Sequence, residues 1–300
     1  MRYDYYSARV EVTPPDLLTE CLKLGHELRP CDGLAKAYRY RQGWQVHHHQ
    51  KGVVATVLAG GNGDHPFAWA SSDSTEPFVD LVRAKWLNQH LPTRMDPAQD
   101  FNDASAFKRL RKIGRAVAKE HGLAFPAISD ELNPNAGRTQ YLGSPKSDYR
   151  VRLYEKGWEQ VEKLGMWGAL GRVGITPEKG LPDDLRIINE ATGELVKPSD
   201  WVRIEAQCRP QGEEARRLAA IASPEEAWGF TAWTHELAKR ALSIDLERLY
   251  IRTRKRSTDQ AALEWMCGQY ANMLQRLKGD LGDWQSVGLT IGELVNKQQP

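Results

Sequence analysis

Polar and apolar residues alternate along several short segments of the chain, and this period of two is typical of strands. It predicts strands over residues 5–12, 37–49, 52–59, 93–101, 139–142, 148–156 and 201–209. Apolar residues at helical spacing predict helices over 16–24, 78–91, 104–121 and 157–164, and further helices after residue 210. The sequence therefore predicts an α+β fold, with a mainly antiparallel sheet, flanking helices and a helical C-terminal region.

The order of these elements suggests two domains. Residues 1–215 would form the α+β body, with a motif-bearing half over 93–215 and a less distinctive half over 1–92. Ser223-Pro224-Glu225-Glu226 has the features of a helix start, with Ser as N-cap, Pro in the first turn and Glu at the capping-box position. We expect residues 216–300 to form the helical C-terminal region.

Composition narrows the class of protein. Hydrophobic residues make up 41% of the 300 positions and charged residues 27%, which excludes a wholly disordered chain, a collagen and a coiled-coil rod. No segment approaches the roughly 18 consecutive apolar residues that a membrane helix needs, and the first residues lack the pattern of a secretory signal. The four cysteines lack metal-site spacing. We therefore expect a protein of a reducing compartment, the bacterial cytoplasm.

The net charge of +2 does not by itself indicate a nucleic-acid partner, but the distribution of basic residues is uneven. The predicted helix over 103–122 carries six cations, Lys108, Arg109, Arg111, Lys112, Arg115 and Lys119. A second basic cluster consists of Arg252, Arg254, Lys255 and Arg256. Either cluster is suited to non-specific contacts with phosphates, and either is equally consistent with an ordinary solvated surface.

Three predicted strands carry polar side chains at alternate positions, which places those side chains on one face of a sheet. The three in-phase sets are Arg94, Asp96 and Asp100; Arg150, Arg152, Tyr154 and Lys156; and Arg203, Glu205 and Gln207. The three carboxylates are hard oxygen ligands suited to Mg²⁺ or Mn²⁺, and the arginines and lysine are suited to phosphate oxygens. A tyrosine among such cations can attack a phosphodiester. Together these residues indicate a DNA-nicking site in which the cut end stays attached to the protein.

Two motifs in the middle of the chain resemble a known family. Gly143-Ser144-Pro145-Lys146-Ser147, followed by Arg152-Leu153-Tyr154-Glu155-Lys156, is similar to a block of the replication initiation factor family. These proteins are rolling-circle initiators of plasmids and filamentous-type phages, with related conjugative relaxases. The strands that begin at Thr93 and at Trp201 resemble two further blocks, so the likeness spans about residues 93 to 209.

The resemblance implies a role for each matched residue. Tyr154 would be the nucleophile, leaving a 5′-phosphotyrosine and a free 3′-hydroxyl. Asp96, Asp100 and Glu205 would hold the divalent ion, while Arg152 and Lys156 would position the scissile phosphate. The remaining contacts to DNA would come from Arg94, Arg150 and Arg203 together with the cluster at Arg252, Arg254, Lys255 and Arg256.

This chain departs from the family pattern at two positions. Glu155 replaces the usual Asp or Asn, which is harmless if its side chain faces away from the site. Pro97 directly follows Asp96 and lacks a backbone N–H, which predicts an edge strand or a bulge there. Such a bulge bears on whether both aspartates reach one metal ion.

Several other residues could be read as nucleophiles, metal ligands or phosphate-binding residues. Tyr149 is out of phase with the arginines and is expected on the opposite, core face, whereas Tyr141 precedes a turn and could stack on a base. In His47-His48-His49, His47 and His49 would share a strand face, so metal binding there is an open alternative to a polar surface. The glycines between Gly165 and Gly174 lack the ending of a nucleotide-binding loop and are expected to form a flexible connection.

The predicted function is initiation of rolling-circle replication by metal-dependent nicking of origin DNA, single-stranded or in a hairpin, followed by strand rejoining. No ATPase motif is visible, so a host helicase would unwind the duplex and a DNA polymerase would extend the 3′-hydroxyl. The single candidate tyrosine suggests a second subunit, hence a homodimer, or a second nucleophile for termination. A conjugative relaxase, a non-catalytic DNA-binding regulator and a nuclease that uses water remain alternatives.

Overall fold

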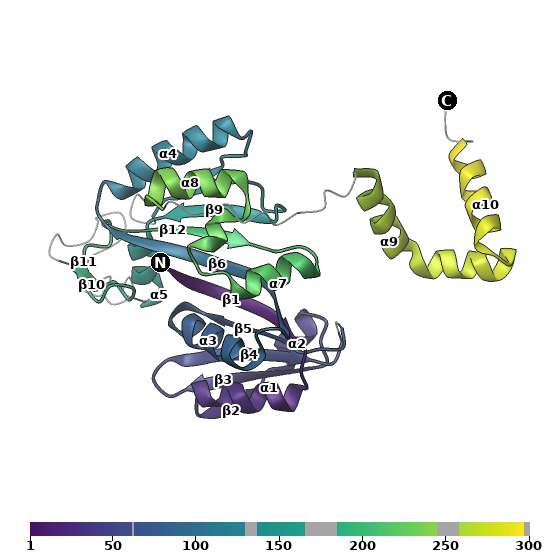
Figure 1. Cartoon of the computed structure of the whole chain (residues 1–300), viewed down its shortest axis with the longest axis horizontal. Helices are drawn as coiled ribbons and strands as arrows, with labels where there is room; N and C mark the ends of the chain where they lie inside the picture. The colour runs from purple at the N-terminus through teal and green to yellow at the C-terminus, as the bar shows by residue number, and fades with distance from the viewer. Residues whose placement is uncertain (62, 130–136, 166–184, 245–257, 297–300) are drawn as a thin grey trace. The chain divides into compact units, whose positions relative to one another are not determined.

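The computed structural model describes residues 1–61, 63–129, 137–165, 185–244 and 258–296, and it divides the chain into two compact units, Met1–Arg252 and Thr253–Pro300. The first unit is built on a ten-stranded sheet with the order β2-β3-β4-β5-β1-β6-β12-β9-β8-β7 (Figure 1). Every pairing in this sheet is antiparallel. The predicted fold class is therefore confirmed.

The strands of the large sheet are β1 (Arg2–Val10), β2 (Glu27–Pro30), β3 (Gln42–His48), β4 (Gly52–Ala59), β5 (Phe67–Ser71), β6 (His90–Asn102), β7 (Ala127–Ile128), β8 (Thr139–Leu142), β9 (Tyr149–Tyr154) and β12 (Trp201–Cys208). A separate two-stranded sheet pairs β10 (Ile187–Ile188) with β11 (Leu195–Val196). The helices of this unit are α1 (Pro14–Cys21), α2 (Asp32–Ala37), α3 (Thr75–Trp86), α4 (Ala106–Glu120), α5 (Lys156–Lys163), α7 (Glu213–Ile221) and α8 (Ala232–Leu242), with 3₁₀ turns at Leu22–Leu24, Ser72–Ser74 and Glu226–Phe230.

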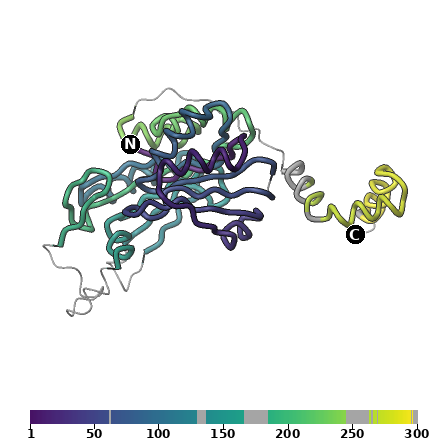
Figure 2. The backbone as a smooth tube through the Cα atoms, turned by 90° about the horizontal axis from the view of Figure 1, so that it is seen from below, coloured from purple at the N-terminus to yellow at the C-terminus, as the bar shows by residue number. Residues whose placement is uncertain are grey.

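Five helices, α1, α3, α4, α7 and α8, pack against one face of the sheet. Their apolar residues join those of the strands in a single core cluster, and Figure 2 shows these helices gathered on one side of the sheet. Strand β9 illustrates how the alternating pattern produces this arrangement. Tyr149, Val151 and Leu153 enter the core, which leaves Arg150, Arg152 and Tyr154 on the other face. The predicted phase is confirmed for these three residues, whereas the expectation that Lys156 continues the strand is wrong, because β9 ends at Tyr154 and Lys156 begins α5.

The sequence pattern located most elements but missed the shortest ones. Residues 37–49 were expected to form one strand, whereas α2 ends at Ala37 and β3 begins only at Gln42. Strands β2 and β5 were not expected. β2 is a four-residue, largely exposed edge strand, so burial imposes little alternation on its sequence. Short elements of this kind are specified by the neighbour with which they pair.

The first unit extends to Arg252, beyond the expected boundary at residue 215. The reason is that α7 packs against β6 and α8 packs against α4, as Figure 1 also shows. The expected capping box is present, because the Ser223 hydroxyl accepts from the Glu226 N–H at 3.1 Å and the Glu226 carboxylate accepts from the Ser223 N–H at 2.8 Å. The turn that it begins, however, is 3₁₀. The apolar faces of α7 and α8 complete the core of the body.

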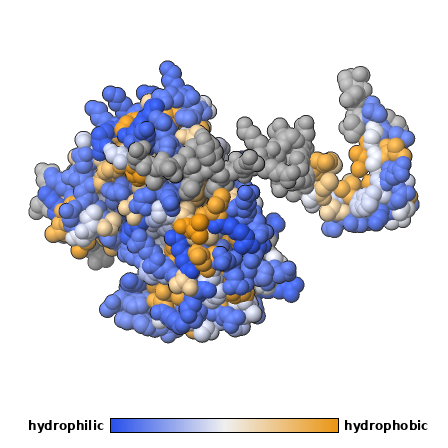
Figure 3. Space-filling view, in the orientation of Figure 1, coloured by the Kyte–Doolittle hydropathy of each residue, from blue (hydrophilic) through white to orange (hydrophobic). Residues whose placement is uncertain are grey.

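The second unit contains α9 (Thr258–Leu281) and α10 (Trp284–Asn296), which contact each other. Leu274 and Val287 are buried, whereas Leu289 and Leu294 are exposed, and Figure 3 shows apolar patches on these helices. The predicted basic cluster at 252–256 lies outside the described residues. None of the helices described here is long and apolar enough to cross a membrane.

Candidate active site

The three strands whose polar faces were predicted to converge are neighbours in the sheet, in the order β6-β12-β9. Arg203 on β12 lies opposite Asp100 on β6 and Tyr154 on β9. Glu205 lies opposite Arg152 in the same register. The fold therefore brings the acids, the arginines and the tyrosine together on the face that the helices of the core leave uncovered.

Tyr154 lies at the centre of this face with only 3% of its surface exposed. Its hydroxyl donates to Oε2 of Glu205 at 3.3 Å, and the guanidinium of Arg152 lies 4.0 Å from the centre of its ring. The Nζ of Lys156 lies 5.7 Å from the same ring. Burial raises the pKa of Tyr154 well above its usual value and the charge of Glu205 raises it further, while Arg152 opposes both. The phenol is thus neutral in the free protein and has an acceptor for its proton.

Asp96 is the most deeply buried acid of the site. It is 1% exposed, and the Nε of Arg94 donates to both of its oxygens at 2.9 and 3.0 Å. Burial raises its pKa to about 7, against the effect of Arg94 and with a further contribution from the nearby charge of Glu205. Arg152 is likewise paired with Glu205, at 3.2 Å. Asp96 and Glu205 therefore form a pair of interacting carboxylates, each held by its own arginine.

Asp100 is in phase with Asp96 but belongs to a different set of contacts. Arg203 donates to its two oxygens at 2.9 and 2.8 Å, and Nε1 of Trp201 donates at 2.6 Å. The predicted ligand set of Asp96, Asp100 and Glu205 is thus not brought together: their carboxylate oxygens do not all lie within 4.8 Å of one another. The reason is the rise of the strand, because four residues along β6 separate two Cα atoms by about 13 Å.

An acid that the sequence did not single out, Asp4, enters the network from β1. Nη1 of Arg203 donates to its Oδ1 at 2.6 Å. Burial would raise the pKa of Asp4, but Arg203 and then Lys156 hold it below its usual value. The register of β1 against β6 shifts at Asp4, opposite Pro97 and Asp96.

The predicted effect of Pro97 is thus confirmed as a bulge, whereas an edge position is wrong, because β6 lies between β1 and β12. A bulge redirects a side chain, and here the redirected residue is Asp4. The missing N–H of Pro97 signalled the bulge, but nothing in the sequence indicated that the residue opposite it would be Asp4.

A polar cavity of about 160 Å³ opens beside the carboxylate pair. It is lined by Arg94, Tyr141, Arg150, Arg152, Glu205 and Gln207. The guanidinium of Arg150 lies 3.7 Å from the centre of the Tyr141 ring. Three arginines around one carboxylate give this cavity a net positive character, which suits a phosphate group.

The structure separates the alternative tyrosines. Tyr149 is buried on the core face, edge-on to Phe230, as its phase predicted. Tyr141 lines the cavity, with the guanidinium of Arg150 over its ring, and stacking on a base stays a prediction. The carboxylate of Glu155, the departure from the family pattern, pairs with Arg138 at 2.6 Å.

A second basic surface lies on α4. A cavity of about 590 Å³ is bordered by Phe107 and by six cations: Lys108, Arg109, Arg111, Lys112, Arg115 and Arg138. Arg109 lies 3.8 Å from Asp103, and Arg111 donates to Gln140. Among the residues that the structure describes, Lys108, Lys112 and Arg115 form no ion pair. We refer to these six cations as the α4 cations, although Arg138 precedes β8. Arg109 and Arg138 are paired with acids, whereas Lys108, Lys112 and Arg115 are free to bind phosphates without a described acid compensating their charge.

Comparison with solved structures identified a similar chain, described as a rolling circle replication initiator protein from Geobacillus stearothermophilus. The two share 16% sequence identity with a TM-score of 0.45, over 86% of this chain and 89% of that one. No family model matches this chain, and no curated protein matches it significantly. The function proposed below rests on the side chains of the site.

Proposed function

We propose that this protein initiates rolling-circle replication by nicking one strand of origin DNA with Tyr154. The observation that carries the proposal is the placement of the Tyr154 hydroxyl against Glu205, beside Arg152 and Lys156 and next to a cavity of phosphate size. A nucleophile, an acceptor for its proton and cations for the phosphate are the components that transfer to a tyrosine requires.

In the nicking step, the phenolic oxygen of Tyr154 attacks the scissile phosphorus while Glu205 accepts the phenolic proton. The bond from phosphorus to the 3′ oxygen breaks, and that oxygen leaves as a 3′-hydroxyl after it takes up a proton. The 5′ end remains on the protein as a phosphotyrosine, so the energy of the phosphodiester is retained. Attack of a free 3′-hydroxyl on the phosphotyrosine reverses the step and rejoins the strand.

The arginines supply the charge that this step needs. Arg152 contacts Glu205 in the free protein and lines the cavity, so an incoming phosphate competes with Glu205 for its guanidinium. That exchange frees Glu205 to act as a base, and it places positive charge next to the phenolic oxygen. Lys156 is buried beside the ring and stabilises the phenolate as it forms.

Asp96 and Glu205 are the residues that would hold a divalent cation such as Mg²⁺ or Mn²⁺. Two close, buried carboxylates are hard oxygen donors. Burial raises the pKa of Asp96 and the nearby charge of Glu205 adds to it, so a cation held by the two acids would favour their ionised forms. When bound, such an ion polarises the phosphate and favours the phenolate. Asp100, which is committed to Arg203, would not be a ligand.

The remaining partners follow from the chemistry. The α4 cations would bind the phosphates of the origin duplex, a host helicase would unwind it and a polymerase would extend the 3′-hydroxyl. Because the described site contains one tyrosine with a base, a second subunit of a homodimer would supply the nucleophile for termination. The cytoplasm of a bacterial host is where such replication takes place. A relaxase of a conjugative element would use the same step on a transfer origin.

The decisive experiment is a denaturing-gel assay for a covalent adduct, with labelled single-stranded origin DNA and Mg²⁺ or Mn²⁺. We expect an adduct with the unaltered protein, none with Tyr154→Phe, and an undiminished adduct with Tyr141→Phe as the matched control. An adduct that persists in Tyr154→Phe would contradict the assignment of the nucleophile. Binding without cleavage or adduct would favour a regulator instead.

A nuclease that uses water is the second candidate, favoured by the burial of Tyr154 and its high pKa. In that case Glu205 would activate water and Tyr154 would only orient Glu205. The product distinguishes the two, because hydrolysis leaves a free 5′-phosphate and no adduct. Tyr154→Phe would then retain cleavage.

A further inference from the structure

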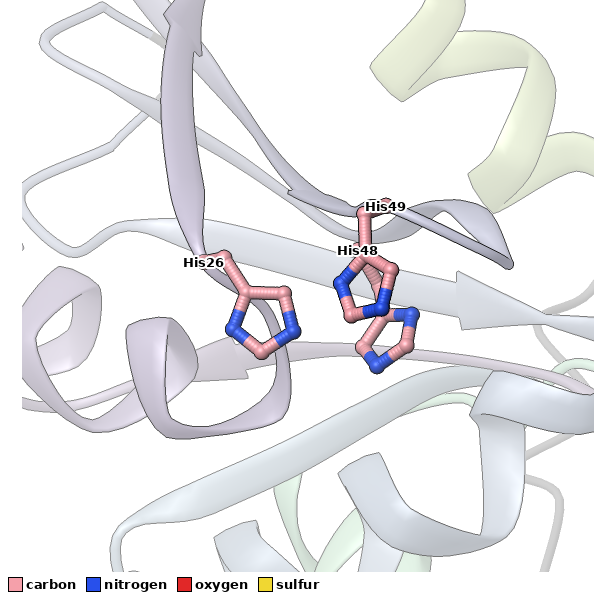
Figure 4. Close-up of side chains that lie close together, drawn as sticks. All are labelled: His26, His48 and His49. Atoms are coloured by element: carbon pink, nitrogen blue, oxygen red, sulfur yellow. The ribbon is translucent and has the colours of Figure 1, made fainter.

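Three histidines come together at the β2 edge of the sheet, outside the site described above. The ring centres of His26, His48 and His49 lie 4.6, 4.7 and 4.5 Å apart, and one nitrogen of each ring lies within 4.8 Å of the other two. Figure 4 shows the three rings turned toward one another from the start of β2 and the end of β3. No other group of three His, Cys, Asp or Glu side chains in the described ranges is as compact.

The local fold holds these rings together. The N–H of His26 donates to the carbonyl of His47 at 2.8 Å, which fixes the start of β2 against the end of β3. Gly25 makes this approach possible, because a Cβ there would lie 2.6 Å from Val46 and 2.7 Å from the His47 carbonyl oxygen. His49 lies just beyond β3, so strand alternation no longer separates it from His48. The sequence placed His47 with His49, and the structure differs for this reason.

We propose that His26, His48 and His49 bind one divalent transition-metal ion of the Zn²⁺ class. Imidazole nitrogens suit Zn²⁺, Ni²⁺ and Cu²⁺, whereas Mg²⁺ requires oxygen ligands. Tetrahedral Zn²⁺ with bonds of about 2.0–2.1 Å sets its nitrogen ligands roughly 3.3 Å apart. His26 and His49 are exposed and His48 is half-buried. The ring of His49 stacks on those of His26 and His48, so metal binding requires the rings to turn until one nitrogen of each points at the ion, and the fourth position would be open to water.

One existing hydrogen bond of His48 would be given up when an ion binds. Its Nδ1 accepts from the N–H of Gln50 at 3.2 Å and therefore carries the lone pair of the neutral ring. An ion bound at Nδ1 displaces this hydrogen bond directly, and an ion bound at Nε2 leaves the ring proton on Nδ1. In both cases the N–H of Gln50 passes to water.

This site is separate from the proposed catalytic cation. Five strand spacings separate β3 from β12, which carries Glu205, or about 24 Å at the usual spacing of strands. An ion among the histidines links β2 to β3, and β2 is the short edge strand of the sheet. The ion would therefore stabilise the β2 edge of the sheet and take no part in nicking.

The test is a titration of the metal-free full chain with Zn²⁺ against a chromophoric chelator. We expect one tight equivalent, with affinity at least tenfold lower in His26→Ala, His48→Ala and His49→Ala. His47→Ala is the matched control, since it removes a neighbouring imidazole outside the cluster, and should bind as the unaltered protein does. Bound Co²⁺ should give the intense visible absorption of a tetrahedral site. This absorption should be absent in the triple variant, in which His26, His48 and His49 are all replaced by Ala.

Two further measurements distinguish the loss of the metal site from the loss of the fold. Zn²⁺ should raise the melting temperature of the unaltered protein but not that of the triple variant, because a ligand stabilises only the state that binds it. The triple variant should still form the covalent DNA adduct, which shows that it is folded. Undiminished Zn²⁺ binding by the triple variant, or an equal loss in His47→Ala, would overturn the proposal and point to cysteines or carboxylates.

Discussion

The active-site face and the α4 surface use the same residue types under opposite physical conditions. On β6 and β12, Arg203 and Asp96 are each 1% exposed, and each is paired with an opposite charge. On α4, Lys108, Lys112 and Arg115 are exposed, and no described acid pairs with them. Buried charges must be compensated in fixed geometry, whereas exposed ones tolerate solvent.

Under the proposed function, this comparison separates basic residues that would serve the chemistry from those that would serve DNA affinity. A charge held by neighbours acts at a defined atom, so its removal should damage folding or the nicking step. An unpaired surface cation attracts the DNA phosphates electrostatically. Each one removed should therefore weaken DNA binding by a similar amount and leave the fold unchanged. The following four predictions test this division, from the largest expected effect to the smallest.

Removing Arg203 should be the most damaging change. Arg203→Met leaves Asp4 and Asp100 buried without their cation, and breaking a buried pair in this way costs about 3–5 kcal/mol of unfolding free energy. Urea denaturation followed by circular dichroism measures this loss. Arg109→Met on α4 is the matched control and should change stability by less than about 0.5 kcal/mol. Equal losses in the two variants would abolish the distinction between the two surfaces.

Glu205→Gln should leave the protein folded but slow nicking by about 10²–10⁴-fold, the usual contribution of a positioned general base. Single-turnover cleavage of labelled origin DNA measures the rate. Glu213→Gln, on the exposed start of α7, serves as the control and should cleave normally. A Glu205→Gln rate within threefold of the unaltered protein would remove Glu205 from the mechanism.

Asp96 should make stability depend on pH in the direction opposite to a normal salt bridge. Its pKa is raised to about 7, so the folded state binds the proton more tightly than the unfolded state. The stabilisation is present at about pH 4 and is lost as the pH rises through 7. Relative to Asp96→Asn, the unaltered protein should lose at least about 1 kcal/mol over this window, measured by denaturation at each pH. A constant difference between the two proteins would contradict the raised pKa.

Single substitutions on α4 should have the smallest effects. Lys112→Ala or Arg115→Ala should weaken duplex binding a few-fold and lower the salt slope by about one for each phosphate that the side chain neutralised. Fluorescence anisotropy at several salt concentrations measures both quantities. Lys23→Ala, on a basic residue paired with Glu20, is the control. Unchanged affinity and slope in the α4 variants would show an ordinary solvated surface.

The sequence predicted the strands that carry the site and the phase of their side chains. Alternation along β9 and β12 reports burial directly, because one face of each strand enters the core. It could not predict which acids meet, since that depends on register and on the bulge at Asp4. Nor could it reveal the histidine cluster, because His26 and His48 belong to segments that pair only in the folded chain.

By itself, then, the sequence determined the fold class and the polar face, because a linear chain displays local period and residue chemistry. Tyr154 was singled out as candidate nucleophile by its flanking Arg152 and Lys156 together with the resemblance to the family motif. Only the tertiary structure decided that Asp100 belongs to Arg203, that Asp4 enters the site and that His26 joins His48 and His49. Such choices depend on distances between residues far apart in the chain, and those distances exist only once strand pairing has fixed the register.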